Sequence, residues 1–237
     1  AELLGNCNAP DILLAMQPIG PNAQRYIELT KKYPNSKFST IVDNETMLSI
    51  LGELAEVNDI KIHLWVDINN GMNRTGIDQD IPSPKIVAGG SPTFPFHCKR
   101  KNVESSPGTT LLWDIGYGAQ FPEMNFLPAA ILITRIVSKP TTGILCFDLG
   151  HKSIAPEMPF PRIEFLDLEH SNQISQSEEH LVVEYDDLTI PEVGDVHYAI
   201  PKHICPTVAK YDTLTVVKDG AIIDHWKVTA RTHKLTI

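Results

Sequence analysis

The chain contains 237 residues, of which 42% are hydrophobic and 21% are charged, and its formal net charge is -9. A chain of this length and composition can bury one large core or two modest ones. The acidic balance argues against a nucleic-acid partner, which requires a basic face, and no apolar run is long enough to span a bilayer. Four cysteines in a chain of this length do not indicate a disulfide framework. We therefore expect a reduced, cytoplasmic setting and no membrane partner.

The first third of the sequence alternates predicted strands and helices. Runs of aliphatic residues predict strands at 11–16, 37–42 and 60–68. A helix is predicted over 22–33, and Asp43 is the expected N-cap of the next one. This βαβαβ order predicts a parallel sheet or barrel, whose ligands bind at the carboxyl ends of the strands.

The pattern changes near residue 126, after which short β runs alternate with turns and no helix is predicted. Asp219-Gly220 between the last two runs is a strong hairpin signal. The prediction is an α/β barrel portion at 1–125 followed by an antiparallel β domain at 126–237. The predicted runs lie at 129–137, 143–148, 180–185, 195–200, 214–217 and 221–230.

One joint does not fit a complete barrel. Only a few residues separate Ile77 from the strand that begins at Lys85, whereas a βα unit needs about 30 residues. We therefore expect a (β/α)8-type barrel that is incomplete in this sequence.

A glycine-rich loop follows the strand that ends at Ala88. Gly89, Gly90, Ser91, Pro92 and Thr93 combine two glycines with two hydroxyl residues. Glycines let backbone amides approach an anion closely, and hydroxyls add donors. The pattern is equally consistent with an anion-binding loop and with a plain Gly-Pro turn.

A second polar loop, at residues 69–76, carries Arg74. The planar guanidinium of arginine supplies fixed donors to an oxyanion or a phenolate. The pattern alone favours a solvated loop arginine.

A third cluster places His203 and Cys205 two residues apart, between Pro201 and Pro206. In an extended segment both side chains can face one point, and imidazole with thiolate is a zinc-type pair. A packed cysteine beside a surface histidine is the default interpretation of so short a motif.

Taken together, the three clusters resemble the fold-type III pyridoxal-phosphate (PLP) enzymes, and within them the D-threonine aldolase and D-serine dehydratase family. Glu104, Ser106–Thr110 and Trp113-Asp114 are similar to the family strand that also contacts the phosphate, and 148–152 and 177–180 match family segments. The resemblance implies a homodimer with PLP and a divalent metal, either zinc or manganese or magnesium. The implied phosphate contacts are Gly90, Ser91, Thr93, Gly108 and Thr109, with Arg74 near the phenolic oxygen and His203 and Cys205 as metal ligands.

The sequence departs from the family at the lysine that carries the cofactor. The family segment of the type Arg-Pro-His-x-Lys-Thr is absent, and Arg231–Lys234 resembles it only superficially. Lys85, Lys99 and Lys101 lie near the glycine-rich loop, but none matches the motif. The sequence belongs either to a longer enzyme or to a truncated relative. We expect the first, because skipping whole strands would leave their parallel neighbours unpaired.

The function implied by the resemblance is that of a metal-dependent lyase acting on a small D-β-hydroxy amino acid. A retro-aldol cleavage of the D-threonine aldolase type is expected, and the alternative is dehydration of D-serine to pyruvate and ammonia. An amino-acid racemase and a non-catalytic PLP-binding protein are further alternatives, against which the His203/Cys205 pair argues. His180, in Glu178-Glu179-His180, is either a further catalytic residue or a structural histidine of the β domain.

Overall fold

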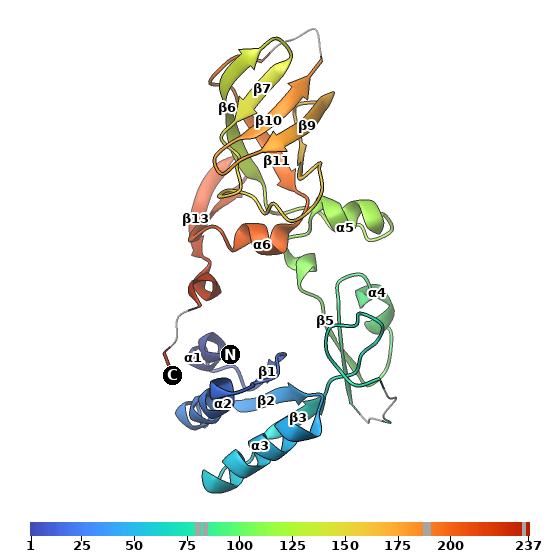
Figure 1. Cartoon of the computed structure of the whole chain (residues 1–237), viewed down its shortest axis with the longest axis vertical. Coiled ribbons are helices and arrows are strands. Elements are labelled where there is room, and N and C mark those ends of the chain that lie inside the picture. Colours follow the sequence, from blue (N-terminus) through green and yellow to red (C-terminus); the bar gives the residue numbers. More distant parts are fainter. Residues whose placement is uncertain (79–81, 83–84, 187–190, 234–235) are drawn as a thin grey trace. The chain divides into compact units, whose positions relative to one another are not determined.

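The structure is a computed structural model that describes residues 1–78, 82, 85–186, 191–233 and 236–237. Its contacts divide the chain into two compact units (Figure 1). Unit 1 comprises residues 1–83 and 233–237, and unit 2 comprises residues 84–232. The expected domain division at residue 125 stays a prediction.

Unit 1 is built on three parallel strands joined by helices, as the alternation of the sequence predicts. The strands pair in the order β1-β2-β3. The apolar stripe of α2 supplies buried Tyr26, Ile27 and Leu29 to a core shared with the sheet and α3. The elements are α1 (Glu2–Asn6), β1 (Asp11–Leu14), α2 (Pro21–Lys32), β2 (Lys37–Val42), α3 (Glu45–Val57) and β3 (His63–Val66).

The start of α3 corrects one prediction. Asn44, rather than Asp43, is the N-cap, since its side-chain oxygen accepts a hydrogen bond from the Met47 amide at 2.8 Å. Asp43 directs its carboxylate to other partners at the end of β2. Asp and Asn have nearly equal N-cap preferences, so two such residues in succession could not be ranked from the sequence.

Unit 2 begins with a second pair of parallel strands, β4 (Ile86–Gly89) and β5 (Val103–Ser106), in which Gly89 lies opposite Ser106. The short helix α4 (Phe94–His97) connects them. The 3-10 helix η1 (Thr109–Leu111) and α5 (Ile115–Gln120) follow. Parallel strands therefore occur in both units, as expected of an α/β fold. A barrel around them stays a prediction.

The rest of unit 2 is dominated by a six-stranded sheet with the order β8-β11-β6-β7-β10-β9, in which all neighbours are antiparallel. The predicted antiparallel β structure is confirmed. Two strands were missed, because β8 has only three residues and β9 is largely polar. The strands are β6 (Leu132–Thr141), β7 (Ile144–Phe147), β8 (Ile163–Phe165), β9 (Ser171–Gln176), β10 (Leu181–Tyr185) and β11 (Val196–Pro201).

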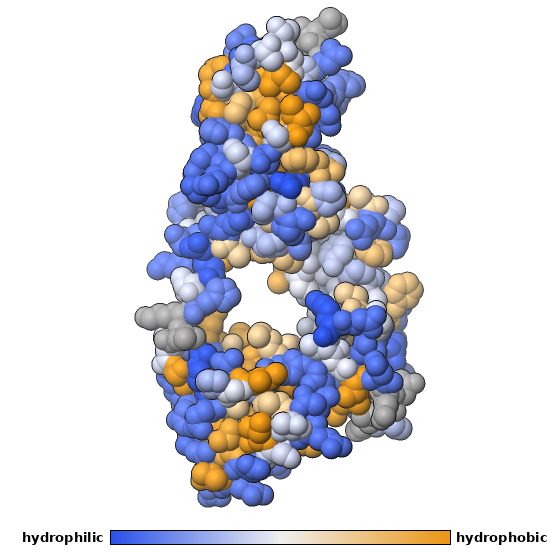
Figure 2. All heavy atoms as spheres, viewed as in Figure 1, coloured by the Kyte–Doolittle hydropathy of each residue, from blue (hydrophilic) through white to orange (hydrophobic). Residues whose placement is uncertain are grey.

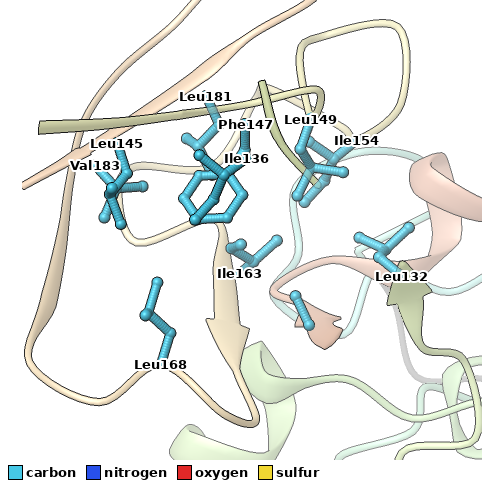
Figure 3. Packing of buried hydrophobic residues seen from close by; sticks show 11 residues of the cluster. Leu132, Ile136, Leu145, Phe147, Leu149, Ile154, Ile163, Leu168, Leu181 and Val183 are labelled. Atoms are coloured by element: carbon cyan, nitrogen blue, oxygen red, sulfur yellow. The ribbon is translucent and has the colours of Figure 1, made fainter. Parts of the chain in front are cut away.

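One face of this sheet carries the core of unit 2 (Figure 3). Phe147 is fully buried and lies opposite Ile136 on β6 and Leu181 on β10. The other face carries exposed apolar residues such as Ile133, which is 69% exposed. Figure 2 accordingly shows apolar surface over the part of the chain that holds the sheet.

The C-terminal part of unit 2 contains α6 (Ile204–Val208), β12 (Thr213–Lys218), β13 (Ala221–Lys227) and the 3-10 helix η2 (Thr229–Thr232). The hairpin predicted at Asp219-Gly220 is confirmed, and both turn residues have positive φ, 51° and 76°, as a two-residue hairpin turn requires. The absence of helices after residue 126 was a wrong prediction, because α6 begins one residue after His203. Within the described ranges, every helix is too short or too polar to cross a lipid bilayer.

Phe147→Ala should lower the free energy of unfolding by about 3–5 kcal/mol, since it removes a fully buried ring from the centre of the sheet core. The matched control, Ile133→Ala on the exposed face of β6, should change it by less than about 0.5 kcal/mol. Urea unfolding followed by tryptophan fluorescence measures both. Equal effects of the two substitutions would contradict this assignment of the core.

Candidate active site

The carboxyl ends of β4 and β5 bring two of the predicted phosphate segments together. Gly89 and Ser106 are register partners, so residues 90–93 and 107–109 leave neighbouring strands at the same edge. Gly90 has a φ of 91°, a conformation that favours glycine. Within the described part of the chain, no hydrogen bond is recorded from the backbone N–H groups of Gly90, Ser91, Thr93 or Gly108. Such free amides at the edge of a sheet are suited to binding an anion.

The hydroxyl of Ser91 connects these two segments. Ser91 is only 3% exposed, and its Oγ accepts a hydrogen bond from the Thr109 amide at 3.1 Å. The Thr93 hydroxyl donates to the carbonyl of Gly89 at 3.0 Å. Both hydroxyls, predicted as phosphate donors, therefore also fix the shape of the loop. The Ser91 hydroxyl keeps its own proton for a further acceptor.

The predicted metal ligands lie at the start of α6. His203 is the N-cap residue and has extended backbone, whereas Cys205 already lies in the first helical turn. The expectation that both residues lie in one extended segment is therefore correct for His203 and wrong for Cys205. Thr109 Oγ1 lies 3.4 Å from Cys205 Sγ, so a predicted phosphate contact touches a predicted metal ligand.

A buried carboxylate holds these segments in place, that of Asp114, which the sequence analysis named in the family-like stretch without giving it a role. Asp114 is 2% exposed, and it accepts hydrogen bonds from the Tyr117 amide at 2.9 Å and from the Ile204 amide at 3.0 Å. It therefore caps α5 and anchors the residue between His203 and Cys205. The sequence signal was an Asp just before a helical stretch, but its second partner is 90 residues away.

The donor chemistry of the His203/Cys205 pair fits a borderline-soft divalent metal. His203 Nδ1 lies 2.5 Å from Glu157 Oε1, and histidine ligands commonly make such a carboxylate contact through the other ring nitrogen. No group of three or more His, Cys, Asp or Glu side chains suited to a metal occurs among the described residues.

Arg74 lies in a loop of unit 1 that is held by several hydrogen bonds. The Asn69 carboxamide oxygen accepts hydrogen bonds from the Gly71 and Asn73 amides, both at 3.1 Å. Ile68 and Ile77 close the loop as a parallel bridge. The Arg74 side chain is exposed, and no hydrogen bond or ion pair of its guanidinium is recorded within the described ranges. The loop thus presents the exposed Arg74 side chain, for which the described residues show no partner, on a hydrogen-bonded backbone.

The carboxyl ends of the three strands in unit 1 carry a polar cluster that the sequence analysis missed. Gln17 Nε2 donates to Asp43 at 2.9 Å and to Asp67 at 3.3 Å. The same Asp43 oxygen accepts the Gly76 amide at 3.2 Å. Asp43 therefore ties the Arg74 loop to the end of β2.

His180 lies in a hairpin between β9 and β10. The backbone amide of Ser177 donates to its carbonyl at 2.8 Å, and its own amide donates to Ser177 Oγ at 3.3 Å. The residue is exposed. No contact recorded for the described residues joins its imidazole to His203 or Cys205, and its catalytic role stays a prediction.

Comparison with known proteins places the chain among its relatives. Residues 129–217, which include His203 and Cys205, match the family described as "Putative serine dehydratase domain". The chain is 32% identical over 109 residues to an uncharacterised protein of Mycobacterium bovis, a match that covers 44% of this chain and 80% of that protein. It is 27% identical over 158 residues to the D-threonine aldolase of Arthrobacter sp., covering 65% of this chain and 41% of the aldolase. The chain thus spans about two fifths of that enzyme.

Two solved structures share the fold. The D-threonine aldolase from Filomicrobium marinum superposes with a TM-score of 0.85 at 17% identity, covering 99% of this chain and 80% of that one. An alanine variant of D-threo-3-hydroxyaspartate dehydratase superposes with a TM-score of 0.75 at 12% identity, covering 91% of this chain and 76% of that one. The fold and the relatives define the class of fold-type III PLP enzymes. The chain belongs to their D-threonine aldolase and D-serine dehydratase family.

Asp114→Ala should destabilise unit 2 by about 2–4 kcal/mol, because it leaves two backbone N–H groups without an acceptor. Hydrogen exchange should accelerate at the amides of Tyr117 and Ile204 in particular. Asp148→Ala is the matched control, since the Asp148 carboxylate accepts hydrogen bonds from Thr134 and Arg135 of β6 instead. Unchanged exchange at Ile204 in Asp114→Ala would contradict the anchoring role.

Gly76→Ala should loosen the Arg74 loop. An added Cβ would lie 2.4 Å from the Asn69 nitrogen, and Gly76 has a φ of 100°. Amide exchange over residues 69–78 should accelerate by at least about tenfold, the equivalent of about 1.4 kcal/mol. Gly52→Ala in α3, where nothing lies within 4 Å, should leave that exchange unchanged.

Proposed function

We propose that this chain forms the phosphate and metal sides of the active site of a PLP-dependent lyase that acts on D-β-hydroxy amino acids. The observation that carries the proposal is the chain of contacts from Ser91 through Thr109 to Cys205. It joins the loop that we propose to bind the phosphate to Cys205, which we propose as a metal ligand, in a member of this enzyme family. A plain Gly-Pro turn at residues 89–93 would not need to contact Cys205 through Thr109, and neither would a cysteine that only fills the core.

The residues of the chain divide the work between them. The amides of Gly90, Ser91 and Gly108 would bind the cofactor phosphate, with Thr93 and Thr109 shaping the two loops. Arg74 would place its guanidinium near the phenolic oxygen. PLP, when bound, supplies the electron sink that lets a bond at the substrate Cα break.

His203 and Cys205 would hold a divalent cation, zinc or else manganese or magnesium. Such a cation, when bound, acts as a Lewis acid towards a hydroxyl group. Two of the similar solved structures support this role. They are alanine variants of D-threo-3-hydroxyaspartate dehydratase, one at a histidine and one at a cysteine two positions further on, the latter in a metal-free form.

Cleavage of D-threonine to glycine and an aldehyde is the first candidate reaction, supported by the relationship to the Arthrobacter aldolase. Dehydration of D-serine is the second. It is favoured by the cysteine at position 205 and by the dehydratase family that matches residues 129–217. A homodimer and a cytoplasmic location belong to the same proposal.

The test supplies the protein that contains this sequence with PLP and Zn²⁺ or Mn²⁺, and with D-threonine or D-serine as substrate. We expect one of these substrates to be consumed, the L-enantiomers to be spared, and chelator to abolish the activity reversibly. His203→Ala and Cys205→Ser should each lower kcat/KM by more than about 100-fold, because each removes a metal ligand. His225→Ala and Cys7→Ser, at exposed positions, are the controls. Activity that chelator does not change would sink the metal-assisted lyase proposal.

A further inference from the structure

Glu157 makes a contact with His203 that has chemical consequences for the imidazole. Glu157 Oε1 lies 2.5 Å from His203 Nδ1. An ionised carboxylate can only accept a hydrogen bond. The proton of a neutral His203 ring must therefore lie on Nδ1, and the lone pair on Nε2.

The backbone on both sides of this contact is held in place. The Thr207 hydroxyl donates to the His203 carbonyl at 2.7 Å and accepts the Ala155 amide at 3.3 Å. On the other side, Lys202 Nζ donates to the Pro159 carbonyl at 3.0 Å. Residues 155–159 are thus attached to 202–207 at both ends. The contact between Glu157 and His203 is therefore set by the fold of the segment as well as by two side-chain rotamers.

The immediate surroundings leave His203 accessible. The side chains of His203 and Glu157 are 40% and 44% exposed. Cys205 is also exposed, and its recorded partner is the Thr109 hydroxyl. Both candidate ligands are therefore accessible to solvent in this unit.

We propose that Glu157 is a positioning residue that fixes the tautomer and orientation of His203, so that Nε2 is the atom offered to the metal. This inference rests on the proposed function for the presence of the metal. It goes further in naming a carboxylate 46 residues away in sequence that acts through the histidine. Carboxylates in this position orient the ring and raise the basicity of the ligand, and their loss typically lowers metal affinity 10–100-fold.

The first experiment needs no metal. In the ¹⁵N-histidine-labelled chain, at a pH where His203 is neutral, long-range ¹H–¹⁵N spectra should show Nδ1 protonated and Nε2 unprotonated. Glu157→Ala should shift His203 towards a mixture of tautomers, whereas Glu157→Gln, whose carbonyl can still accept from Nδ1–H, should shift it less. Glu169→Ala, at an exposed glutamate, is the control. An unchanged tautomer in Glu157→Ala would overturn the inference, since a merely structural glutamate would not affect it.

The second experiment titrates the same chains with Co²⁺, whose visible spectrum reports thiolate coordination. Glu157→Ala should weaken binding by about 10–100-fold while the thiolate band remains, with Glu157→Gln intermediate and Glu169→Ala unchanged. If His203→Ala and Cys205→Ser abolish binding but Glu157→Ala does not weaken it, the positioning role fails and the metal site stands. If His203→Ala and Cys205→Ser leave binding unchanged, the metal assignment of the proposed function fails. The tautomer spectra then still decide whether Glu157 controls His203.

Discussion

The geometry of the candidate site in unit 2 depends on one buried carboxylate, that of Asp114. Its two oxygens accept one amide at the start of α5 and another at Ile204, so a single side chain connects the helical segment after β5 with the first residue of α6. A buried carboxylate is tolerated only when its oxygens are hydrogen-bonded. Asp114 must therefore keep both hydrogen bonds. Because one of them is to the Ile204 amide, it also fixes the backbone between His203 and Cys205.

The backbone around Asp114 reinforces the same connection. The Gly116 amide donates to the Lys202 carbonyl at 3.1 Å, and a Cβ at Gly116 would lie 2.4 Å from that oxygen. Only glycine lets the backbone segments at Gly116 and Lys202 approach so closely. From there the contact between Thr109 and Cys205, and that between Thr109 and Ser91, extend the ordered region to the end of β4. Preorganisation of this kind keeps binding groups in place without a ligand.

Local patterns in the sequence predicted the parallel strands of unit 1, most of the antiparallel sheet and the hairpin at Asp219-Gly220. Each depends on the period of apolar residues or on a turn preference within a few positions. The helix at 204–208 was not predicted, because its five residues are too few to show a helical period and include Pro206. The contacts of Asp114, Gln17 and Glu157 were not predicted for another reason. Their partners lie 90, 26 and 46 residues away, and pairings at such separations leave no local signal.

The same distinction separates the two kinds of residue in the candidate site. The glycines, Arg74, His203 and Cys205 carry recognisable chemistry in short motifs, so a family resemblance could name them. The residues that hold them, Asp43 for the Arg74 loop and Asp114 and Glu157 for the metal segment, are ordinary acidic residues in the sequence. Each becomes specific only through the amide or imidazole that it accepts from. In both units, then, carboxylates distant in sequence determine where the recognisable groups lie, and a motif alone defines the donors of a site without fixing their geometry.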